Sequence, residues 1–426
     1  MEDLIDKYKQ DFELEILQEE IILKKYLKDE QEVVIPQGVT TIAENAFRYN
    51  KTIEIITIPE SVTKINKMAF ADCKKLNCIF FNAINCQDLT KDDVPFIDCV
   101  RFSDHYITKK YYELFFSEKP TTLYKVIIGK QVKRIPNYLF YNSNITSLEF
   151  AEDCVCQVIG AYAFYNCDFL KIIRLPNSLL QVETEGFGNH SSWDIYYNGN
   201  MADLLKVTFY DYGANPINRF NVFYLNNEPL ESLDLVLDET ITSIPKKACS
   251  SWKFLNSVII KGQVTEIGES AFAYCKNLKK VILPSSLKTI GSHAFEFCES
   301  LTEIELPSGL THLKERAFSS CYNLPKITLP IGVTELNESA FSICSKMAKI
   351  DILGEITTIK ESCFYACTGL KEITLPNTIK KIETLAFWSC ENLTINFNGT
   401  KKEWKKIKKV RHWNKDCKIQ LNFLKK

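Results

Sequence analysis

The chain has 426 residues, of which 46% are hydrophobic, and its 52 basic and 53 acidic side chains leave a formal net charge of −1. This balance argues against a general polyanion binder, which would carry an excess of Lys and Arg. No stretch approaches the roughly 18 apolar residues of a membrane helix, and the acidic first residues are not typical of a secretion signal. We therefore expect no membrane insertion and a cytoplasmic location.

The first predicted element is an acidic N-terminal cap over residues 1–32, with 11 acidic residues against 5 Lys. Repeats with the template LxxIxLPxxLxxIxxxAFxxC then occupy residues 33–102, 123–190 and 231–394, and six consecutive intervals from Cys249 to Phe387 are 23 residues each. A fixed period in the twenties is typical of a solenoid that stacks one coil per repeat. The Phe position, called the slot, is held by Phe47, Phe70, Phe96, Phe140, Phe164, Phe187, Phe272, Phe295, Phe318, Phe341, Phe364 and Phe387, with Cys249 as the exception.

Each repeat predicts one strand followed by a return leg. In the segment LxxIxLP the fourth and sixth positions point inward and the third and fifth point outward. The Pro ends the strand because it has no N–H for the ladder. Residues such as those at 291–297, GSHAFEF, are expected to form a helical turn that buries the slot Phe. The repeats thus predict one continuous domain of about 13 coils with a parallel sheet.

Two insertions interrupt the period, at residues 103–122 and 191–230. The slot interval from Phe96 to Phe140 is 44 residues and that from Phe187 to Cys249 is 62. We expect the excess to leave the solenoid as loops or small subdomains. Both segments are aromatic, and Tyr196, Tyr210 and Tyr212 in the second could contact a partner, although such side chains more often pack on their own scaffold.

The cysteines follow the repeat. Nine of the 16 lie three residues after a slot position: Cys73, Cys99, Cys167, Cys275, Cys298, Cys321, Cys344, Cys367 and Cys390. In a solenoid these positions stack inside, where a free Cys behaves as a small hydrophobic residue. The register therefore favours reduced thiols and a reducing compartment.

The repeat resembles that of the BspA-like leucine-rich-repeat family, and the likeness extends to segments outside the template. FFNAINCQDLTKDDVPFIDC at 80–99 is similar to a variant coil of the family, and INFNGTKKEWKKIKKVRHWNKDC at 395–417 is similar to its closing segment. The resemblance implies a right-handed horseshoe with a C-terminal cap over 395–426, in which Gly399, Thr400, Trp404 and Trp413 are cap residues. An internal copy at 195–209 departs from the closing segment, with Met201 in place of the Thr and Leu204 in place of the Trp.

The sequence contains no recognisable catalytic, cofactor or metal motif. Five histidines, His105, His190, His293, His312 and His412, show neither HxH nor HxxxH spacing. The patterns of a P-loop, a dinucleotide-binding glycine motif and a nucleophile elbow are also missing. We therefore expect neither catalysis nor a cofactor.

The outward fifth positions of the strands form the predicted contact surface. The row begins with Val236, Ile259 and Ile282 and continues with Glu305, Thr328, Asp351 and Thr374. An exposed apolar group of this kind often marks an interface, although β-propensity alone explains such residues on an open sheet. The third positions mix charges, which argues against nucleic acid.

These patterns predict a monomeric, non-enzymatic recognition module that binds an unidentified protein through its strand face and inserted loops. The first alternative is an adhesin, because relatives in the resembling family are often exported and bind host or matrix proteins. The second is a structural component that associates head to tail, because residues 1–32 are acidic and residues 401–426 carry 11 basic side chains against 2 acidic ones.

Overall fold

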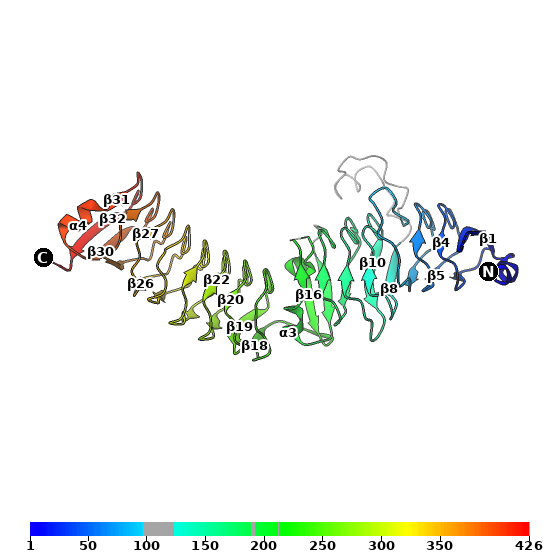
Figure 1. The fold of residues 1–426 in the computed structure, drawn as a ribbon, viewed down its shortest axis with the longest axis horizontal. Helices are drawn as coiled ribbons and strands as arrows, with labels where there is room; N and C mark the ends of the chain where they lie inside the picture. The colour runs from blue at the N-terminus through cyan, green and yellow to red at the C-terminus, as the bar shows by residue number, and fades with distance from the viewer. Residues whose placement is uncertain (97–122, 189–191, 212, 426) are drawn as a thin grey trace. The chain divides into compact units, whose positions relative to one another are not determined.

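The computed structural model describes residues 1–96, 123–188, 192–211 and 213–425. The described chain divides into two compact units (Figure 1). The N-terminal unit comprises Met1–Gly199 and Phe209–Pro229, and the C-terminal unit comprises Asn200–Thr208 and Leu230–Lys426. The single continuous domain that the sequence predicts stays a prediction, and each unit is described by itself. The boundary between the two units lies in residues 195–209, the internal copy of the closing segment.

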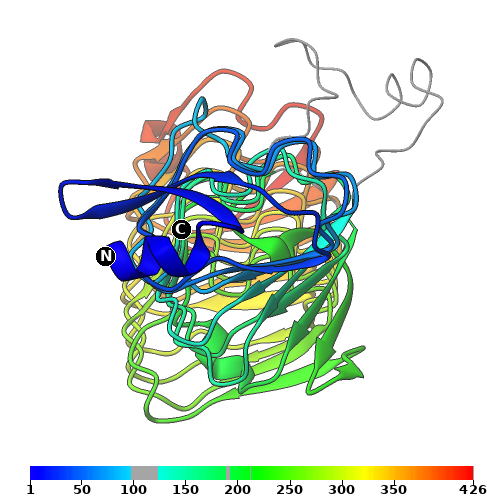
Figure 2. The ribbon, with the colours of Figure 1, turned by 90° about the vertical axis from the view of Figure 1, so that its right-hand side faces the viewer.

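The N-terminal unit is a stack of coils whose strands pair in parallel. Helix α1 (Glu2–Tyr8) and the antiparallel hairpin of β1 (Phe12–Leu17) and β2 (Glu20–Tyr26) lie at its N-terminal end (Figure 2). The main sheet contains, in spatial order, β3 (Glu32–Val34), β5 (Ile55–Ile58), β7 (Cys78–Phe81), β8 (Tyr124–Ile128), β10 (Ile145–Phe150), β12 (Ile172–Leu175), β14 (Trp193–Tyr197), β16 (Phe220–Leu225) and β17 (Glu228–Pro229). Two-residue strands on the return legs are β4 (Thr41–Ile42), β6 (Lys64–Ile65), β9 (Arg134–Ile135), β11 (Val158–Ile159), β13 (Gln181–Val182) and β15 (Thr208–Phe209).

The C-terminal unit repeats this arrangement. Its main strands are β18 (Leu233–Leu237), β19 (Leu255–Ile260), β21 (Lys280–Ile282) and β23 (Glu303–Ile304) in one sheet, and β25 (Lys326–Leu329), β26 (Lys349–Ile352), β28 (Glu372–Pro376), β30 (Asn392–Asn398) and β32 (Lys418–Phe423) in another. The short strands are β20 (Glu266–Ile267), β22 (Thr289–Ile290), β24 (His312–Leu313), β27 (Thr358–Ile359), β29 (Lys381–Ile382) and β31 (Lys408–Lys409). The described residues of the two units make about 16 turns, slightly more than the 13 that the slot positions predict.

The core of every regular coil is built around the slot Phe. Consecutive slot rings stack with centroids 4.8–5.8 Å apart and interplanar angles of 3–26°. Phe96 stacks directly on Phe140, so the first insertion does not interrupt the column. Tyr26 extends the column at its N-terminal end by stacking on Phe47 at 5.5 Å. Each coil therefore depends on its neighbours for burial of its largest side chain.

A column of thiols accompanies the rings, as the register predicts. Eight of the nine repeat cysteines donate their S–H to the slot carbonyl of the preceding coil at 3.0–3.2 Å, and Cys99 lies outside the described residues. All eight are buried free thiols. The exceptional coil reverses the usual sizes, with Cys249 in the slot and Trp252 in the cysteine position, and both side chains are fully buried.

The return legs differ from the predicted helical turns. The described repeats form turns there, and α-helix occurs instead in α1, in α3 (Met201–Leu204) and in α4 (Lys401–Lys406), with a 3₁₀ turn at η1 (Pro216–Arg219). Each regular leg contains two residues with positive φ, one before the Ala and one two residues after the slot, such as His293 at 59° and Phe297 at 56°. A right-handed helix cannot continue through such residues. This geometry recurs from coil to coil.

The segment 191–230 also differs from its prediction. Instead of leaving the solenoid, it supplies β14, which pairs in parallel with β12, and β16, which pairs in parallel with β14. Strand β17 then closes the sheet with an antiparallel hairpin. Most of its aromatic side chains, including Tyr197, Phe209 and Phe223, are buried. Most of these aromatic residues therefore pack in the core of their own scaffold, which was the more common of the two roles considered for them. The other predicted insertion, 103–122, lies outside the described residues.

The predicted cap residues Gly399, Thr400, Trp404 and Trp413 lie after the last regular coil, at and beside helix α4. Thr400 and Glu403 form a capping box at the start of α4, with the Thr400 N–H donating to Glu403 Oε2 at 2.7 Å. A Cβ on Gly399 would lie 2.6 Å from the Phe397 ring, so the turn requires glycine. Trp404 is buried against Phe397, and Trp413 meets the last slot ring, Phe387, edge to face at 6.1 Å.

The internal copy of this segment adopts a similar strand–helix order, β14 then α3. Asn200, not Met201, occupies the position of Thr400, and its side chain accepts the Ala202 N–H as an N-cap. Leu204 is buried in the position of Trp404. The internal copy thus keeps a helix N-cap, with Asn200 in place of the Thr.

Candidate functional site

The predicted outward row is present as a continuous strip on β18, β19 and β21. Val236 lies opposite Ile259, and Ile259 lies opposite Ile282, in the parallel register. Val236 is 46% exposed and Ile282 is 43% exposed, whereas Ile259 is partly exposed. Neighbouring strands lie about 4.8 Å apart, so the three side chains are adjacent. We call Val236, Ile259 and Ile282 the apolar row.

Polar side chains border the apolar row on the third positions of the same strands. Asp234 accepts hydrogen bonds from Ser257 Oγ at 2.6 Å and from Asn256 Nδ2 at 2.8 Å. These hydrogen bonds, with that of Ser257 first, lower the pKa of Asp234. Lys280 forms an ion pair with Glu303 at 2.8 Å. The border is thus internally paired and of mixed charge, which matches the polar rim of a protein interface better than a basic stripe.

The remaining predicted strand residues lie further along the C-terminal unit. Glu305 and Thr328 are exposed, and Thr328 lies opposite Asp351 in the sheet. Asp351 forms an ion pair with Lys349 at 2.9 Å. These residues occupy the same outward strand position as the apolar row, but their side chains are polar. They therefore form a separate, polar part of the strand face.

Tyr196 and Tyr210 are not part of this strip, because they belong to the N-terminal unit. Tyr196 stacks on Tyr224 at 4.3 Å and beneath the guanidinium of Arg174 at 4.2 Å, so its ring packs on its own scaffold. Tyr210 is 57% exposed, with its hydroxyl 3.5 Å from Gln181 Nε2. Tyr212 lies outside the described residues.

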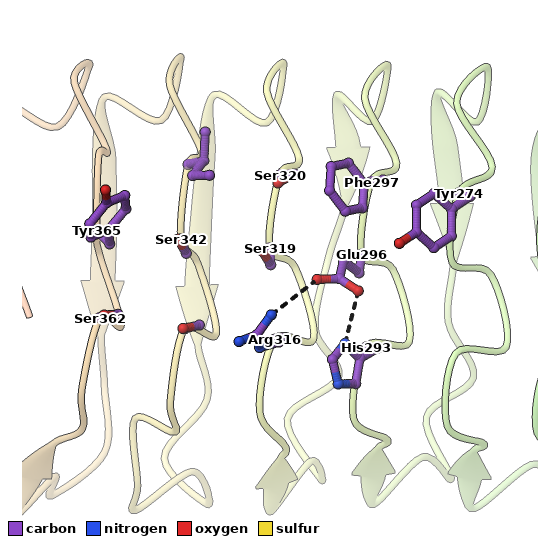
Figure 3. Close-up of a pocket in the computed structure, with 12 residues that line it drawn as sticks. Tyr274, His293, Glu296, Phe297, Arg316, Ser319, Ser320, Ser342, Ser362 and Tyr365 are labelled. Atoms are coloured by element: carbon purple, nitrogen blue, oxygen red, sulfur yellow. Dashed lines mark hydrogen bonds and ion pairs between the residues drawn. The ribbon is translucent and has the colours of Figure 1, made fainter.

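A second feature, which the sequence reasoning missed, is a groove of about 540 Å³ on the return legs of the C-terminal unit (Figure 3). Its floor consists of Ser319, Ser320, Ser339, Ser342 and Ser362, and we call it the serine groove. Aromatic side chains border it, with Tyr274 and Phe297 on one side and Tyr365 on the other. The groove exists because the intervening coils carry serines where their neighbours carry large residues.

One end of the serine groove is charged but balanced. Glu296, only 8% exposed, lies with Oε2 2.8 Å from His293 Nδ1 and with Oε1 4.0 Å from Arg316 Nη1 (Figure 3). The single carboxylate is therefore matched by the single guanidinium. This end offers hydrogen-bonding groups of both kinds without a strong net charge.

Two cysteines in the core of the C-terminal unit, Cys249 and Cys275, are poor candidates for a nucleophile. Burial raises the pKa of the Cys275 thiol to about 12 and that of the Cys249 thiol well above its usual value. Since the thiolate is the reactive form, these groups are unreactive near neutral pH. In the part of the chain that the structure describes, no three His, Cys, Asp or Glu side chains gather as metal ligands. Within the same residues, no helix has the length and apolar character needed to cross a membrane.

Comparison with known proteins identifies the repeat. A family model described as a BspA type leucine rich repeat region (6 copies) matches residues 25–114, 113–215, 216–347 and 265–394. No curated protein matches this chain.

Several solved structures are similar over nearly their whole length. A leucine-rich repeat protein from Bacteroides ovatus is 20% identical, covers 97% of this chain and 98% of its own, and has a TM-score of 0.49. The pneumococcal vaccine antigen PcpA is 16% identical, with 96% of each chain covered and a TM-score of 0.47. A leucine rich cell surface protein from Faecalibacterium prausnitzii is 20% identical, covers 93% of this chain and 96% of its own, and has a TM-score of 0.37. At these identities the likeness concerns the fold.

Proposed function

We propose that this chain, which belongs to the BspA-type leucine-rich repeat family, is a non-enzymatic recognition module that binds another protein through the apolar row. The observation that carries the proposal is the registered exposure of Val236, Ile259 and Ile282 on adjacent strands. Contiguous apolar surface on a folded protein is a common property of interfaces.

The strands hold this surface in a fixed geometry. Val258 and Ile260, which flank Ile259 in the chain, are buried, so the outward side chain is carried by a strand anchored in the core. A preorganised surface loses little conformational entropy on binding, which favours affinity. The paired charges beside it, Lys280 and Glu303, would form the rim of the interface and contribute specificity more than affinity.

The experiment compares capture of partners from native lysate by the unchanged protein and by the double variant Ile259→Lys, Ile282→Lys. We expect the double variant to lose the captured protein, because a desolvated apolar contact at an interface centre often contributes more than about 2 kcal/mol. Val34→Lys is the matched control, since Val34 is also an exposed strand residue, 66% exposed, but lies in the N-terminal unit. Equal capture by all three proteins, with native circular dichroism, would refute the proposal.

The partner class follows from the charge pattern. The third positions of this face mix charges, with Asp234 and Lys280 beside the apolar row and both Lys and Glu further along, so a nucleic acid would meet repulsion as well as attraction. We also propose that the protein is monomeric and acts without catalysis, in agreement with the elevated pKa values of its buried thiols. The double variant Glu305→Lys, Asp351→Lys tests whether the polar end of the row contributes.

The proposed location is the cytoplasm, because fifteen free cysteines in the described residues are best maintained in a reducing compartment. The adhesin alternative places the protein outside the cell. Fractionation of source cells distinguishes the two: recovery in the cytosolic fraction supports our proposal, and recovery on intact cell surfaces or in the medium supports the adhesin.

Head-to-tail association remains a second candidate function because the two ends carry opposite charge. The acidic residues of 1–32 and the basic residues of 401–426 would attract each other between copies. Such attraction weakens with salt. Light scattering that shows assemblies at low ionic strength, and their loss at high ionic strength, would favour this candidate.

A further inference from the structure

Strand β32 (Lys418–Phe423) forms one edge of a sheet in the C-terminal unit, whose spatial order is β25, β26, β28, β30 and β32 (Figure 1). In the part of the chain that the structure describes, β32 pairs with β30 alone. An unpaired edge presents a row of backbone N–H and C=O groups to which another chain can add as a further strand.

The hydrogen bonds between β32 and β30 show which backbone groups point to the open edge. The Lys418 N–H donates to the Glu391 carbonyl at 2.9 Å. The Leu424 N–H donates to the Phe397 carbonyl, also at 2.9 Å. Backbone groups alternate between the two sides of a strand in a parallel ladder, so the odd-numbered residues of β32 direct their N–H and C=O groups away from β30. These residues are Ile419, Leu421 and Phe423.

The side chains of the same three residues leave one end of the core partly uncovered. They lie opposite three fully buried residues of β30, Leu393, Ile395 and Phe397. Leu421 is 36% exposed, and Ile419 and Phe423 are partly exposed. A strand added beside β32 would place its own inward side chains over them and remove apolar surface from water, which favours binding.

The chain around this edge is basic. Residues 401–426 contain 11 basic and 2 acidic side chains. Both acidic side chains have local partners, because Glu403 accepts the Thr400 N–H at 2.7 Å and Asp416 accepts the Trp388 Nε1–H at 2.7 Å. Lys418 on the strand is exposed and forms no ion pair with any described residue. The edge therefore attracts a segment that carries acidic side chains.

A hollow of about 230 Å³ adjoins the start of β32. Its lining is shared by two paired strands and consists of Asn392, Leu393, Thr394, Lys418, Ile419 and Gln420. The amide, hydroxyl and ammonium groups among these side chains can donate hydrogen bonds to a carboxylate. The hollow thus suits an acidic side chain of a segment that lies along β32.

We propose that the outer edge of β32 binds an extended segment of a protein partner in which acidic and apolar side chains alternate. The backbone of the segment continues the ladder, a mode of peptide recognition that uses the main chain for affinity and alternate side chains for specificity. Its apolar side chains cover Leu421, and its acidic side chains lie on the side of Lys418. This edge is separate from the apolar row and does not rest on the proposed function.

The experiment measures dissociation constants by fluorescence anisotropy on the purified full chain. The probe is a labelled, end-capped peptide of four Glu–Val pairs. One control peptide consists of four Lys–Val pairs and reverses the charge. The other is the Glu–Val peptide with every backbone nitrogen methylated, which keeps the charge but has no N–H to donate. The second control separates strand addition from simple charge attraction.

The decisive variant is Leu421→Pro, which removes an N–H from the open edge and leaves the hydrogen bonds to β30 in place. Proline is tolerated on edge strands where the lost N–H does not belong to the ladder. Val34→Pro is the matched control, on the edge strand β3 of the N-terminal unit. The Ile35 N–H donates to the Thr57 carbonyl of β5, so the Val34 N–H also points away from its sheet.

A second pair of variants tests the charge. Lys418→Glu reverses the exposed charge on β32. Lys74→Glu is the matched control, because Lys74 is also exposed but lies in the N-terminal unit.

We expect the Glu–Val peptide to bind the unchanged protein and both control variants with the same dissociation constant. Leu421→Pro should bind it about tenfold more weakly, because one hydrogen bond is lost and a carbonyl of the peptide is left unpaired. Lys418→Glu should also weaken binding, and the Lys–Val and methylated peptides should bind far more weakly than the Glu–Val peptide.

Unchanged affinity in Leu421→Pro, with native circular dichroism, would overturn the proposal. Absence of Glu–Val binding, or equal binding of the methylated peptide, would also overturn it, and these results do not depend on the folding of any variant. Dimers of the unchanged protein that Leu421→Pro abolishes would assign the edge to a second copy and overturn its assignment to a separate partner. Since the probes are peptides, a negative result leaves the apolar row untouched.

Discussion

Replacement of Phe318 by Ala tests the aromatic column most sharply. Phe318 is fully buried, stacked on Phe295 at 5.3 Å and on Phe341 at 5.8 Å with interplanar angles of 5° and 3°. Its truncation removes contacts at two coil interfaces at once. Phe→Ala changes in cores lower the free energy of unfolding by about 3–5 kcal/mol. Since domains are stable by about 5–15 kcal/mol, the C-terminal unit should lose a large part of its stability.

The matched control is Phe297→Ala, the same change in the preceding coil. Phe297 is only partly buried and stacks on one ring, Tyr274. Loss of one such pair lowers stability by about 1 kcal/mol. Urea unfolding followed by circular dichroism should therefore show a much larger shift of the midpoint for Phe318→Ala than for Phe297→Ala. Equal shifts would mean that the slot column does not hold the coils together, and would refute the reasoning.

Three further predictions concern the thiols and the cap. Few cysteines should react with a thiol reagent in the native protein and close to sixteen after unfolding without reductant, and several disulfides in protein taken directly from its source would contradict this. Burial raises the pKa of thiols such as Cys275. Above the ordinary thiol pKa of about 8.5, the folded state therefore retains protons that the unfolded chain loses, and the free energy of unfolding should fall as the pH rises. A free energy of unfolding that stays constant up to about pH 11 would refute the burial of these thiols. Deletion of residues 395–426 removes Trp413 from Phe387 and should cause aggregation or a clear loss of melting temperature, whereas a monomer with native melting would contradict the cap assignment.

The regular coils could be predicted from sequence because their burial repeats in register. Phe at the slot and Cys three residues later appear in coil after coil, so the position of Phe295 or Cys298 inside the stack follows from its neighbours. The same reasoning placed Val236, Ile259 and Ile282 on one outward strip, because strand side chains alternate between faces. It could not establish what that strip binds.

The structure departs from the predictions in segments that the repeat template does not align with the neighbouring coils. The segment 191–230 matches no template copy, and its aromatic residues are compatible with both loop and core, so β14 and β16 became visible only through their pairing. The return legs contain GSHAFEF-like sequence with ordinary helix formers, yet His293 and Phe297 adopt positive φ because the coil must turn twice within a few residues.

The serine groove corresponds to a recognisable pattern in the sequence. Alignment of the repeats two residues after the slot gives Tyr274, Phe297, Ser320 and Ile343, in which the serine stands out. Whether a serine at this position opens a groove depends on how exposed the side chains there are and on how they stack, and the repeat template specifies neither. The pairing of Glu296 with His293 likewise depends on the outward orientation of the turn.

The central claim, that the apolar row binds a protein, is tested most directly by calorimetric titration of the captured and purified partner. We expect the unchanged protein and Val34→Lys to bind with the same dissociation constant, and Ile259→Lys, Ile282→Lys to bind at least about 30-fold more weakly, which corresponds to roughly 2 kcal/mol. Binding of the double variant with unchanged affinity, while its circular dichroism and melting remain native, would contradict the claim.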